Sequence, residues 1–324
     1  MLKIIKEYLV TNYFIVGIRL IPDIFFEFIN LVINLGESKM FSNKSKFEAF
    51  IKMETHAIEK GLSLPKPRVN FREQKINNLL LKINYYLAQF NDIEFITYPL
   101  GIVKEYIDCN NSPAVFFNYN KIIDTYKLGN RIPENIATTI IKNSSNTIIT
   151  TSGYEQFVLE RHSIRNFADK KVNIELINKA LSIANNCPSA CNRQPWKTYI
   201  FVNPDSRQEI LDLQGGSKGF NENIQIALLI TSNLNDYFLS EQHQSYIDGG
   251  LFAMSLIYAL HSLGLGTIPL TLSLKRKKNK EIMKKFNIPA NESLIMVIGV
   301  GYPNSDIKVA HSLKKVFTEN TIYL

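Results

Sequence analysis

Apolar residues recur at helical spacing through most of the first 150 positions of the chain. The stretches 46–60 and 73–90 place apolar side chains every three or four residues, which is the spacing of one helix face. Between them, Pro65 and Pro67 exclude regular helix and indicate a loop. We therefore expect residues 1–150 to form a mainly helical N-terminal region.

After a segment at 142–153 that is rich in Asn, Ser and Thr, and that predicts a linker or an edge element, the pattern changes. The compact apolar runs 198–203 and 224–232 predict strands with little exposure, and 292–303 predicts another buried strand with a turn. Helices are expected at 155–161, at 172–187 with Asn173 as the N-cap, at 246–266 and at 280–288. This alternation predicts an α/β (α+β) fold of layered sheet and helices for residues 151–324, as a second domain.

The helix expected at 246–266 is apolar over most of its circumference and ends at Gly264 or Gly266. A helix of this kind has to be covered on both sides. The sheet covers one side in this interpretation, and a second subunit is a candidate for the other.

Residues 8–34 are strongly apolar, but Arg19, Asp23 and Glu27 interrupt them and Pro22 divides them. An uninterrupted span of about 20 apolar residues is missing, which argues against a transmembrane helix. No small-residue cleavage site follows, which argues against a signal peptide. Two interpretations stay open: two amphipathic helices packed on the rest of the protein, or helices that lie in a membrane interface.

Composition limits the function further. The net charge of +8 is moderate, and Lys and Arg are spread over the 324 residues without a basic stripe or a recognisable module, so nucleic-acid binding is not expected. Three cysteines are too few for a disulfide framework and indicate a reducing compartment, the cytoplasm. Cys187 and Cys191 have no second Cys/His pair nearby, so we expect no structural zinc site.

Three short segments carry candidate chemistry. Arg161, Ser163 and Arg165 place two guanidinium groups and a hydroxyl within five residues, a set that can hold a phosphate monoester, although a surface turn has the same pattern. The segment 186–196 is stiffened by two prolines and offers polar side chains that suit the edge of a polar heterocycle. The segment 263–267 contains two glycines, which allow a backbone to approach a planar ligand but also end a helix.

In this order and spacing, the segments ERHSIRNF, PSACNRQPW, IDGGLFAMSLIYALHSLGLGT and VIGVGYP resemble the nitroreductase family. The resemblance covers nearly the whole C-terminal half. It implies an α/β fold with two intertwined subunits, and an FMN at each of two interface sites.

The resemblance also implies roles for individual residues. Residues that would hold the FMN phosphate and ribityl chain are Arg161, His162, Ser163 and Arg165. Residues that would approach the flavin from the partner subunit are Pro188, Ser189 and Asn192, with Gln194 supporting their loop. Leu265, Gly266 and Thr267 would pass near the ring system.

After the G-Y-P turn the family usually adds a basic residue that reaches the phosphate. Lys308, His311 and Lys314 are the candidates here, and the sequence leaves the choice open.

The chemistry implied by the resemblance is an FMN-dependent oxidoreductase that takes hydride from NAD(P)H and reduces an unidentified organic acceptor. Nitro- or quinone-type compounds would serve as test substrates, and no side chain has to act as an acid or base. The choice between NADH and NADPH stays open. A flavin-binding module without turnover is an alternative.

The N-terminal segment HAIEKGLSLP at 56–65 resembles an extension carried by some nitroreductase-like proteins found near surface-polysaccharide genes. A redox enzyme related to surface polysaccharides and anchored by its N-terminal region is therefore a further alternative. His56, Glu59, Lys60 and Arg68 either line an acceptor pocket or form a capping and ion-pair network, and both interpretations stay open.

Overall fold

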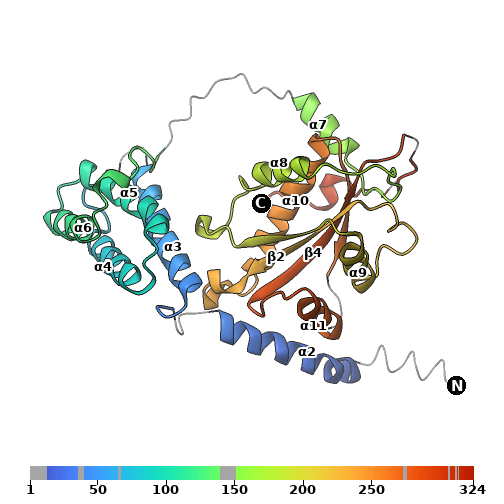
Figure 1. The fold of residues 1–324 in the computed structure, drawn as a ribbon, viewed down its shortest axis with the longest axis horizontal. Helices are drawn as coiled ribbons and strands as arrows, with labels where there is room; N and C mark the ends of the chain where they lie inside the picture. The colour runs from blue at the N-terminus through green and yellow to red at the C-terminus, as the bar shows by residue number, and fades with distance from the viewer. Residues whose placement is uncertain are drawn as a thin grey trace.

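The computed structural model describes residues 13–35, 40–64, 67–138, 151–272, 276–305, 307–310, 312 and 314–324. Figure 1 shows a group of helices beside a region in which helices cover a sheet. The predicted α/β layered fold with a mainly helical N-terminal region is therefore confirmed. The expected linker at 142–150 lies outside the described residues, and residues 151–153 already belong to helix α7 (Thr151–Glu160).

The N-terminal region consists of α2 (Tyr13–Asn34), α3 (Lys44–Leu62), α4 (Glu73–Phe90), α5 (Ile93–Cys109) and α6 (Pro113–Tyr126). Side-chain caps fix two of the starts. The Asn43 carboxamide oxygen accepts a hydrogen bond from the Lys46 N–H at the start of α3 (3.1 Å), and Asp92 accepts one from the Phe95 N–H at the start of α5 (3.2 Å).

Aromatic rings fill the core of this helical region. Phe47 from α3 packs edge-on against Tyr86 from α4, with ring centroids 5.4 Å apart. Tyr106 from α5 packs edge-on against Phe71, at 5.1 Å. The Tyr86 hydroxyl donates to Glu48 (2.8 Å), so the polar end of this buried ring is satisfied. The helices α3 to α6 thus share one apolar cluster of their own.

The expected division of the N-terminal apolar stretch at Pro22 is wrong, because α2 continues through this proline as one helix. A proline removes one backbone donor and crowds the preceding turn, yet the chain is helical on both sides of Pro22. Large apolar side chains of α2 are exposed, among them Phe25 at 62% and Ile33 at 64%. No helix within the described ranges is long and apolar enough to cross a membrane.

The C-terminal region contains a four-stranded antiparallel sheet in the order β1-β2-β4-β3. Its strands are β1 (Trp196–Phe201), β2 (Ile226–Asn233), β3 (Gly266–Thr271) and β4 (Glu292–Gly301). The sequence did not predict β3: the glycines at 264 and 266 were interpreted as a helix end, and the strand begins at the second of them.

Helices cover both faces of this sheet (Figure 1). One face packs against α8 (Ile174–Ala184) and α10 (Gln244–Ser262), and the other against α9 (Pro204–Gln214) and α11 (Arg276–Lys285). The expected N-cap of α8 is confirmed, since Asn173 accepts from the Glu175 N–H (3.0 Å). Short 3₁₀ turns lie at η1 (Gly129–Arg131), η2 (Ala190–Asn192), η3 (Leu234–Asp236), η4 (Leu239–Glu241) and η5 (Phe317–Glu319).

The two edges of the sheet differ. Along β3, the segment at 163–164 adds a bridge, with the Ile164 N–H donating to the Thr267 carbonyl (2.9 Å). Along β1, no described residue pairs with the outer side. The expectation of little exposure is therefore wrong for β1, where Lys197 and Ile200 are exposed, because an edge strand has a neighbour on one side only. All residues of β2 are buried, as predicted.

The helical region meets the sheet region through polar contacts at the first half of α3. The Ser45 hydroxyl donates to Asp236 (2.9 Å) and accepts from the Asn233 amide (2.7 Å). Lys52 Nζ lies 3.4 Å from the Arg193 carbonyl, to which it donates. Burial raises the pKa of the Asp236 carboxyl to about 6. The junction is thus held by hydrogen bonds between a helix and two loops.

Candidate functional site

The first predicted segment leaves α7 and runs alongside β3. Ile164 and Phe167 point into the core and are buried, while Ser163 and Arg165 remain accessible. This alternation follows from extended backbone, in which successive side chains point to opposite faces. The segment therefore presents its polar side chains outward from the sheet edge.

Steric crowding explains why position 266 is a glycine. A Cβ at this position would lie 2.9 Å from Cγ1 of Ile164, so only glycine allows β3 to approach the segment this closely. The neighbouring Leu265 is 1% exposed and packs in the core, which leaves only its backbone available to a ligand.

The outward-facing residues surround a cavity of about 420 Å³. Its lining contains Arg161, His162, Ser163, Arg165 and Lys314. Among the described lining residues there is no carboxylate, and in the described part of the chain neither arginine forms an ion pair. The chemistry of this set fits a phosphate group, which needs several unpaired donors.

The structure separates the three basic candidates near the C-terminus. Lys314 lines the cavity, whereas Lys308 is exposed and is not among the described lining residues. His311 lies outside the described residues. Tyr258 of α10 also borders this cavity, and the ring of its neighbour His261 packs on Phe157 at 4.8 Å. Burial lowers the pKa of His261.

The second predicted segment is a loop that follows α8. The Ser189 hydroxyl accepts from the Gln194 backbone N–H (2.9 Å), and the Gln194 amide donates to the carbonyl and the side-chain oxygen of Asn192 (3.2 Å each). Gln194 thus ties the two ends of the turn together. Pro188 is exposed at its start. Trp196, at the start of β1, packs against Phe252 in a stacked arrangement with ring centroids 4.8 Å apart.

Two buried charged residues hold this loop, and sequence reasoning missed both. Asp248, in the first half of α10, is 1% exposed and accepts from the Ala190 N–H (3.2 and 3.3 Å) and from the Tyr237 hydroxyl (3.1 Å). Arg193 is fully buried, donates to the Ala190 carbonyl (3.0 Å) and pairs with Glu241 (2.6 Å). The only signal in the sequence is one aspartate within an otherwise apolar helix.

The backbone of this loop is strained. Cys191, Asn192 and Gln194 have φ angles of 51°, 53° and 53°, a region that non-glycine residues adopt rarely. Such conformations persist only when the surroundings determine them, and here the contacts to Asp248 and Arg193 do so. Strain of this kind is concentrated at functional sites in proteins.

The two predicted segments lie apart within one chain. The loop contacts α10 at Asp248, whereas the basic cavity is bordered by Tyr258, ten residues and about 15 Å further along the same helix. The structure therefore brings the basic residues together and the loop residues together, but as two separate groups.

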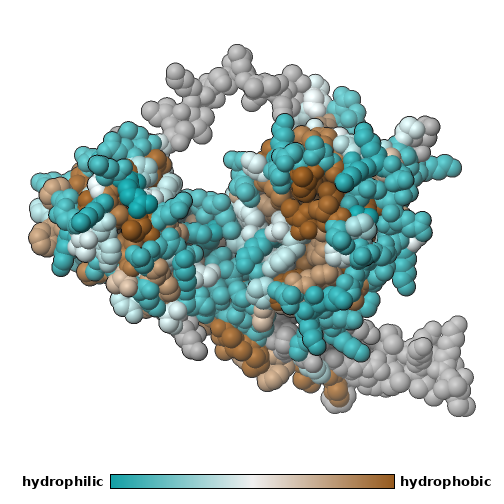
Figure 2. Space-filling model, in the orientation of Figure 1, coloured by the Kyte–Doolittle hydropathy of each residue, from teal (hydrophilic) through white to brown (hydrophobic). Residues whose placement is uncertain are grey.

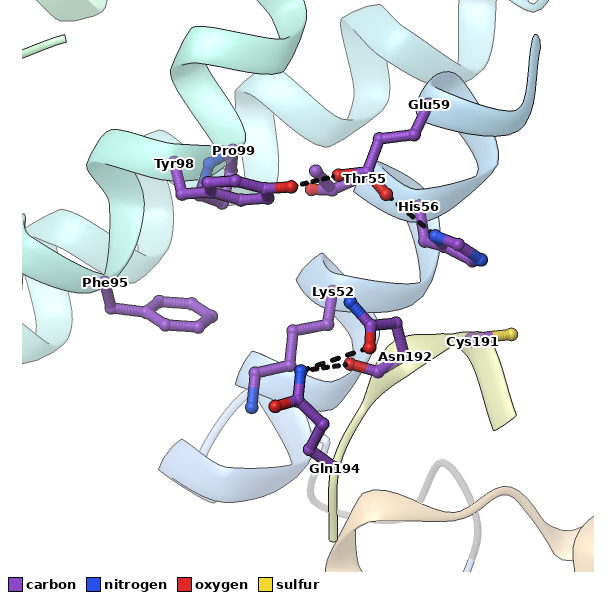
Figure 3. A pocket seen from close by; sticks show the side chains of 10 residues that line it. All are labelled: Lys52, Thr55, His56, Glu59, Phe95, Tyr98, Pro99, Cys191, Asn192 and Gln194. Carbon is purple, nitrogen blue, oxygen red and sulfur yellow. Dashed lines mark hydrogen bonds and ion pairs between the residues drawn. The ribbon is translucent and has the colours of Figure 1, made fainter. Parts of the chain in front are cut away.

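A second cavity, of about 230 Å³, lies between this loop and the helical region. The lining is shared by α3, α5 and the loop, and Figure 3 shows its ten side chains. Glu59 links two other side chains that line this cavity. One of its oxygens contacts His56 Nδ1 (2.7 Å), and the other accepts a hydrogen bond from the Tyr98 hydroxyl (2.6 Å). Burial, followed by this hydrogen bond, raises the pKa of Tyr98, so its phenol stays protonated.

Of the four N-terminal candidates, two belong to this cavity and two do not. His56 and Glu59 line it and contact each other at 2.7 Å, so these two residues remain candidates under both interpretations. Lys60 and Arg68 are exposed and are not among its lining residues.

Comparison with known proteins assigns the sheet region. The sequence model of the Nitroreductase family matches residues 158–218 and 226–302. A candidate NADH dehydrogenase/NAD(P)H nitroreductase of Archaeoglobus fulgidus is 24% identical over 152 residues, 47% of this chain and 86% of that protein. The iodotyrosine deiodinase of Thermotoga neapolitana is 26% identical over 163 residues, 45% of this chain and 86% of that protein.

Among solved structures, a nitroreductase-type protein from Desulfovibrio desulfuricans in complex with FMN superposes with a TM-score of 0.48 at 20% identity, covering 54% of this chain and 98% of that one. The family match and the layered sheet agree with the resemblance seen in the sequence motifs. Residues 158–218 and 226–302 therefore match this family, and we name this part of the chain the nitroreductase domain.

Proposed function

We propose that the protein is an FMN-dependent oxidoreductase that takes hydride from NAD(P)H and reduces a small organic acceptor, and that it works as a homodimer. The observation that carries the proposal is the group of Arg161, Ser163, Arg165 and Lys314 around one cavity, within a domain of the nitroreductase family. The nitroreductase of Desulfovibrio desulfuricans was solved with FMN, which supports the choice of cofactor.

The basic cavity would bind the FMN phosphate. Two planar guanidinium groups and one ammonium group offer more donors than a phosphate monoester needs, and no described carboxylate competes for them. The Ser163 hydroxyl adds a neutral donor beside them. Gly266 lets β3 approach this segment closely, and Ser163, which lines the cavity, pairs with Thr267 of β3.

A second subunit would complete the site. Asn192, Ser189 and Pro188 lie on a loop that does not reach the basic cavity of its own chain, so a loop from the partner would have to face it. Ile247, Leu251 and Met254 form an exposed apolar stripe on α10, with 52%, 46% and 37% exposure, and Met254 also lines the cavity. Figure 2 shows apolar surface over α8 and α10. A subunit contact along this stripe would bring partner residues to the cavity.

Bound FMN would supply the redox chemistry, accepting hydride from NAD(P)H and passing two electrons, with one proton from the cofactor and one from solvent, to the acceptor. The chain's residues would bind and orient. The basic group fixes the phosphate, and the strained loop, held by Asp248, presents Asn192 in one conformation. No side chain has to transfer a proton in this scheme.

An absorbance spectrum of the purified full-length protein, repeated anaerobically after NADPH and then NADH, tests the proposal. We expect a flavin spectrum that bleaches with at least one nucleotide, and reoxidation by a nitro- or quinone-type compound. A flavin that never bleaches would indicate a binding module without turnover. No flavin after incubation with FMN would contradict the proposal.

We also propose that the chain has two domains, 1–150 and 151–324. The helical region has its own apolar cluster, and the clusters around the sheet contain no residue of α3 to α6. The three cysteines are free, which supports a reducing compartment, the cytoplasm.

A second candidate function for the N-terminal part is contact with a lipid surface. Phe25, Phe28 and Ile33 of α2 are exposed by 62%, 59% and 64%, and apolar side chains of a surface helix can insert into a membrane interface. Residues 8–12 of the predicted segment lie outside the described residues. Full-length protein should float with anionic liposomes, and the variant with Phe25→Ser and Phe28→Ser should not. Flotation that is equal for both proteins would contradict this role.

A further inference from the structure

The cavity of about 230 Å³ between the helical region and the strained loop has no assigned role. The family match begins at residue 158, so the α3 and α5 walls of this cavity come from outside the matched domain. The remaining wall is the loop with Asn192 and Gln194. The same loop is proposed above to face the FMN of the partner, which places the cavity beside the proposed flavin site.

We propose that this cavity binds the electron acceptor, and that the acceptor is a one-ring aromatic compound with an oxygen substituent that accepts hydrogen bonds. The inference rests on the proposed function and deepens it, since it makes the helical region the part of the chain that selects the acceptor.

The walls of the cavity suit an aromatic ring. The side chains of Phe95, Tyr98 and Pro99 line one side of it, and Figure 3 shows the Phe95 and Tyr98 rings across from Lys52 and Gln194. Aromatic rings pack favourably on such walls. A cavity of roughly 150 Å³ holds benzene, and pockets for drug-sized ligands begin at roughly 300 Å³, so the observed volume fits one substituted ring.

One donor in the cavity lacks an acceptor, and a second is only partly used. Thr55 is 3% exposed, lines the cavity, and its hydroxyl has no hydrogen-bond partner among the described residues. Lys52 forms no ion pair with a described carboxylate; its ammonium donates to the Arg193 carbonyl at 3.4 Å and lies over the Phe95 ring, 6.0 Å from the centroid. An ammonium group has three donors and no acceptor. A ligand oxygen, as in a nitro group, a quinone carbonyl or a phenolate, would accept a hydrogen bond from the Thr55 hydroxyl.

The carboxylate in the cavity does not oppose such a ligand. Both oxygens of Glu59 already accept, one from His56 and one from Tyr98. Both carboxylate oxygens of Glu59 are therefore already hydrogen-bonded. The polar groups that a ligand oxygen near Lys52 and Thr55 would contact are hydrogen-bond donors. The His56–Glu59–Tyr98 group fixes the ring of Tyr98 as part of the apolar wall.

Isothermal titration calorimetry of 4-nitrophenol into the full-length, FMN-loaded protein, without nucleotide, tests the inference. We expect binding that Thr55→Val weakens about fivefold, the effect of one neutral hydrogen bond. Lys52→Met should weaken it at least as much. The control is Thr97→Val on α5, whose hydroxyl bonds within its own helix to the Glu94 carbonyl, and which should leave binding unchanged.

The same samples separate the two proposals. Protein that bleaches with NADPH but binds no 4-nitrophenol, or binds it equally in both pocket variants, overturns the inference and leaves the proposed function standing. Protein that binds no flavin overturns the proposed function whatever the calorimetry shows. Lys52 is only half-buried, so its variant gives a result even where Thr55→Val does not fold.

Discussion

The helical region and the nitroreductase domain bury their apolar residues in different ways. The helical region has one cluster with edge-on aromatic pairs such as Phe47 and Tyr86. The nitroreductase domain has a fully buried central strand, β2, with an apolar cluster on each face of the sheet. Between the two regions lie hydrogen bonds and a cavity. The difference indicates that the helical region contacts the domain through its surface and not through its core.

The largest expected effect concerns FMN binding, which we assign to the nitroreductase domain alone. Replacing Arg161 and Arg165 together by glutamine removes charge-assisted hydrogen bonds worth about 3–6 kcal/mol in sum, so FMN affinity should fall more than a hundredfold. Quenching of FMN fluorescence on titration measures this. The control Arg131→Gln removes an exposed arginine of the helical region and should change nothing. Equal affinity in the double variant would place the phosphate elsewhere.

The next effect separates the two cores. Phe47 is fully buried in the helical region, and Phe47→Ala should lower the free energy of unfolding of that region by about 3–5 kcal/mol. Denaturation followed by far-ultraviolet circular dichroism and by flavin absorbance should then show two transitions, of which only the first shifts. Phe117→Ala, at a 68% exposed ring of the same region, is the matched control. A common shift of both transitions would mean that the two regions unfold as one unit.

A smaller effect concerns the junction and depends on pH. Burial raises the pKa of the Asp236 carboxyl from its usual 3.8 to about 6, so the folded protein holds this proton more tightly than the unfolded chain. The resulting stability is fully present below about pH 4 and is lost as the pH rises through about 6.

Asp236→Asn should therefore be more stable relative to the natural protein at pH 8 than at pH 4. The expected difference is about 2 kcal/mol, after allowance for the partial exposure of the side chain. Urea denaturation at the two pH values measures it, with Asp205→Asn, an exposed aspartate, as the control. A stability difference between the two proteins that does not change with pH would show that the Asp236 carboxyl has the same pKa in the folded and the unfolded chain.

The smallest of these effects concerns the loop. Asp248→Asn keeps the size of the side chain but replaces an acceptor of the Ala190 N–H and the Tyr237 hydroxyl by a weaker one. We expect FMN affinity to fall about tenfold, or 1.4 kcal/mol, because the loop loses its fixed conformation. Hydrogen exchange at residues 189–194 should accelerate in parallel. Faster exchange with unchanged affinity would show that this loop does not contact FMN.

Local pattern predicted much of the fold, and long-range contacts explain the rest. The stretch 73–90 was predicted with its observed bounds, because its apolar spacing and its flanking loop are both local. The continuation of α2 through Pro22 was missed, because a proline inside an apolar stretch was interpreted as the end of a helix. The strand β3 was missed because Gly266 serves a contact with Ile164, about a hundred residues earlier, that no local pattern reveals.

The same division holds for the candidate site. The basic residues at 161–165 lie close in sequence, and their grouping was predictable. The second cavity joins Lys52, Tyr98 and Asn192, which come from three distant segments, so the sequence offered only the isolated His56–Glu59 pair as a signal. Asp248 and Arg193 hold the loop because they are buried, and the sequence does not reveal that a single charged residue is buried.

The unequal edges of the sheet restrict how this protein can grow into a larger assembly. The segment at 163–164 pairs with Thr267 near the start of β3, whereas the outer row of β1 has no partner within the described chain. An added strand therefore meets no pairing segment of the described chain next to β1, where the exposed Lys197 would disfavour an unselective neighbour. A second copy of the chain or a bound peptide could add one strand beside β1. Further strands could follow on that side only if the added strand has an unpaired outer edge.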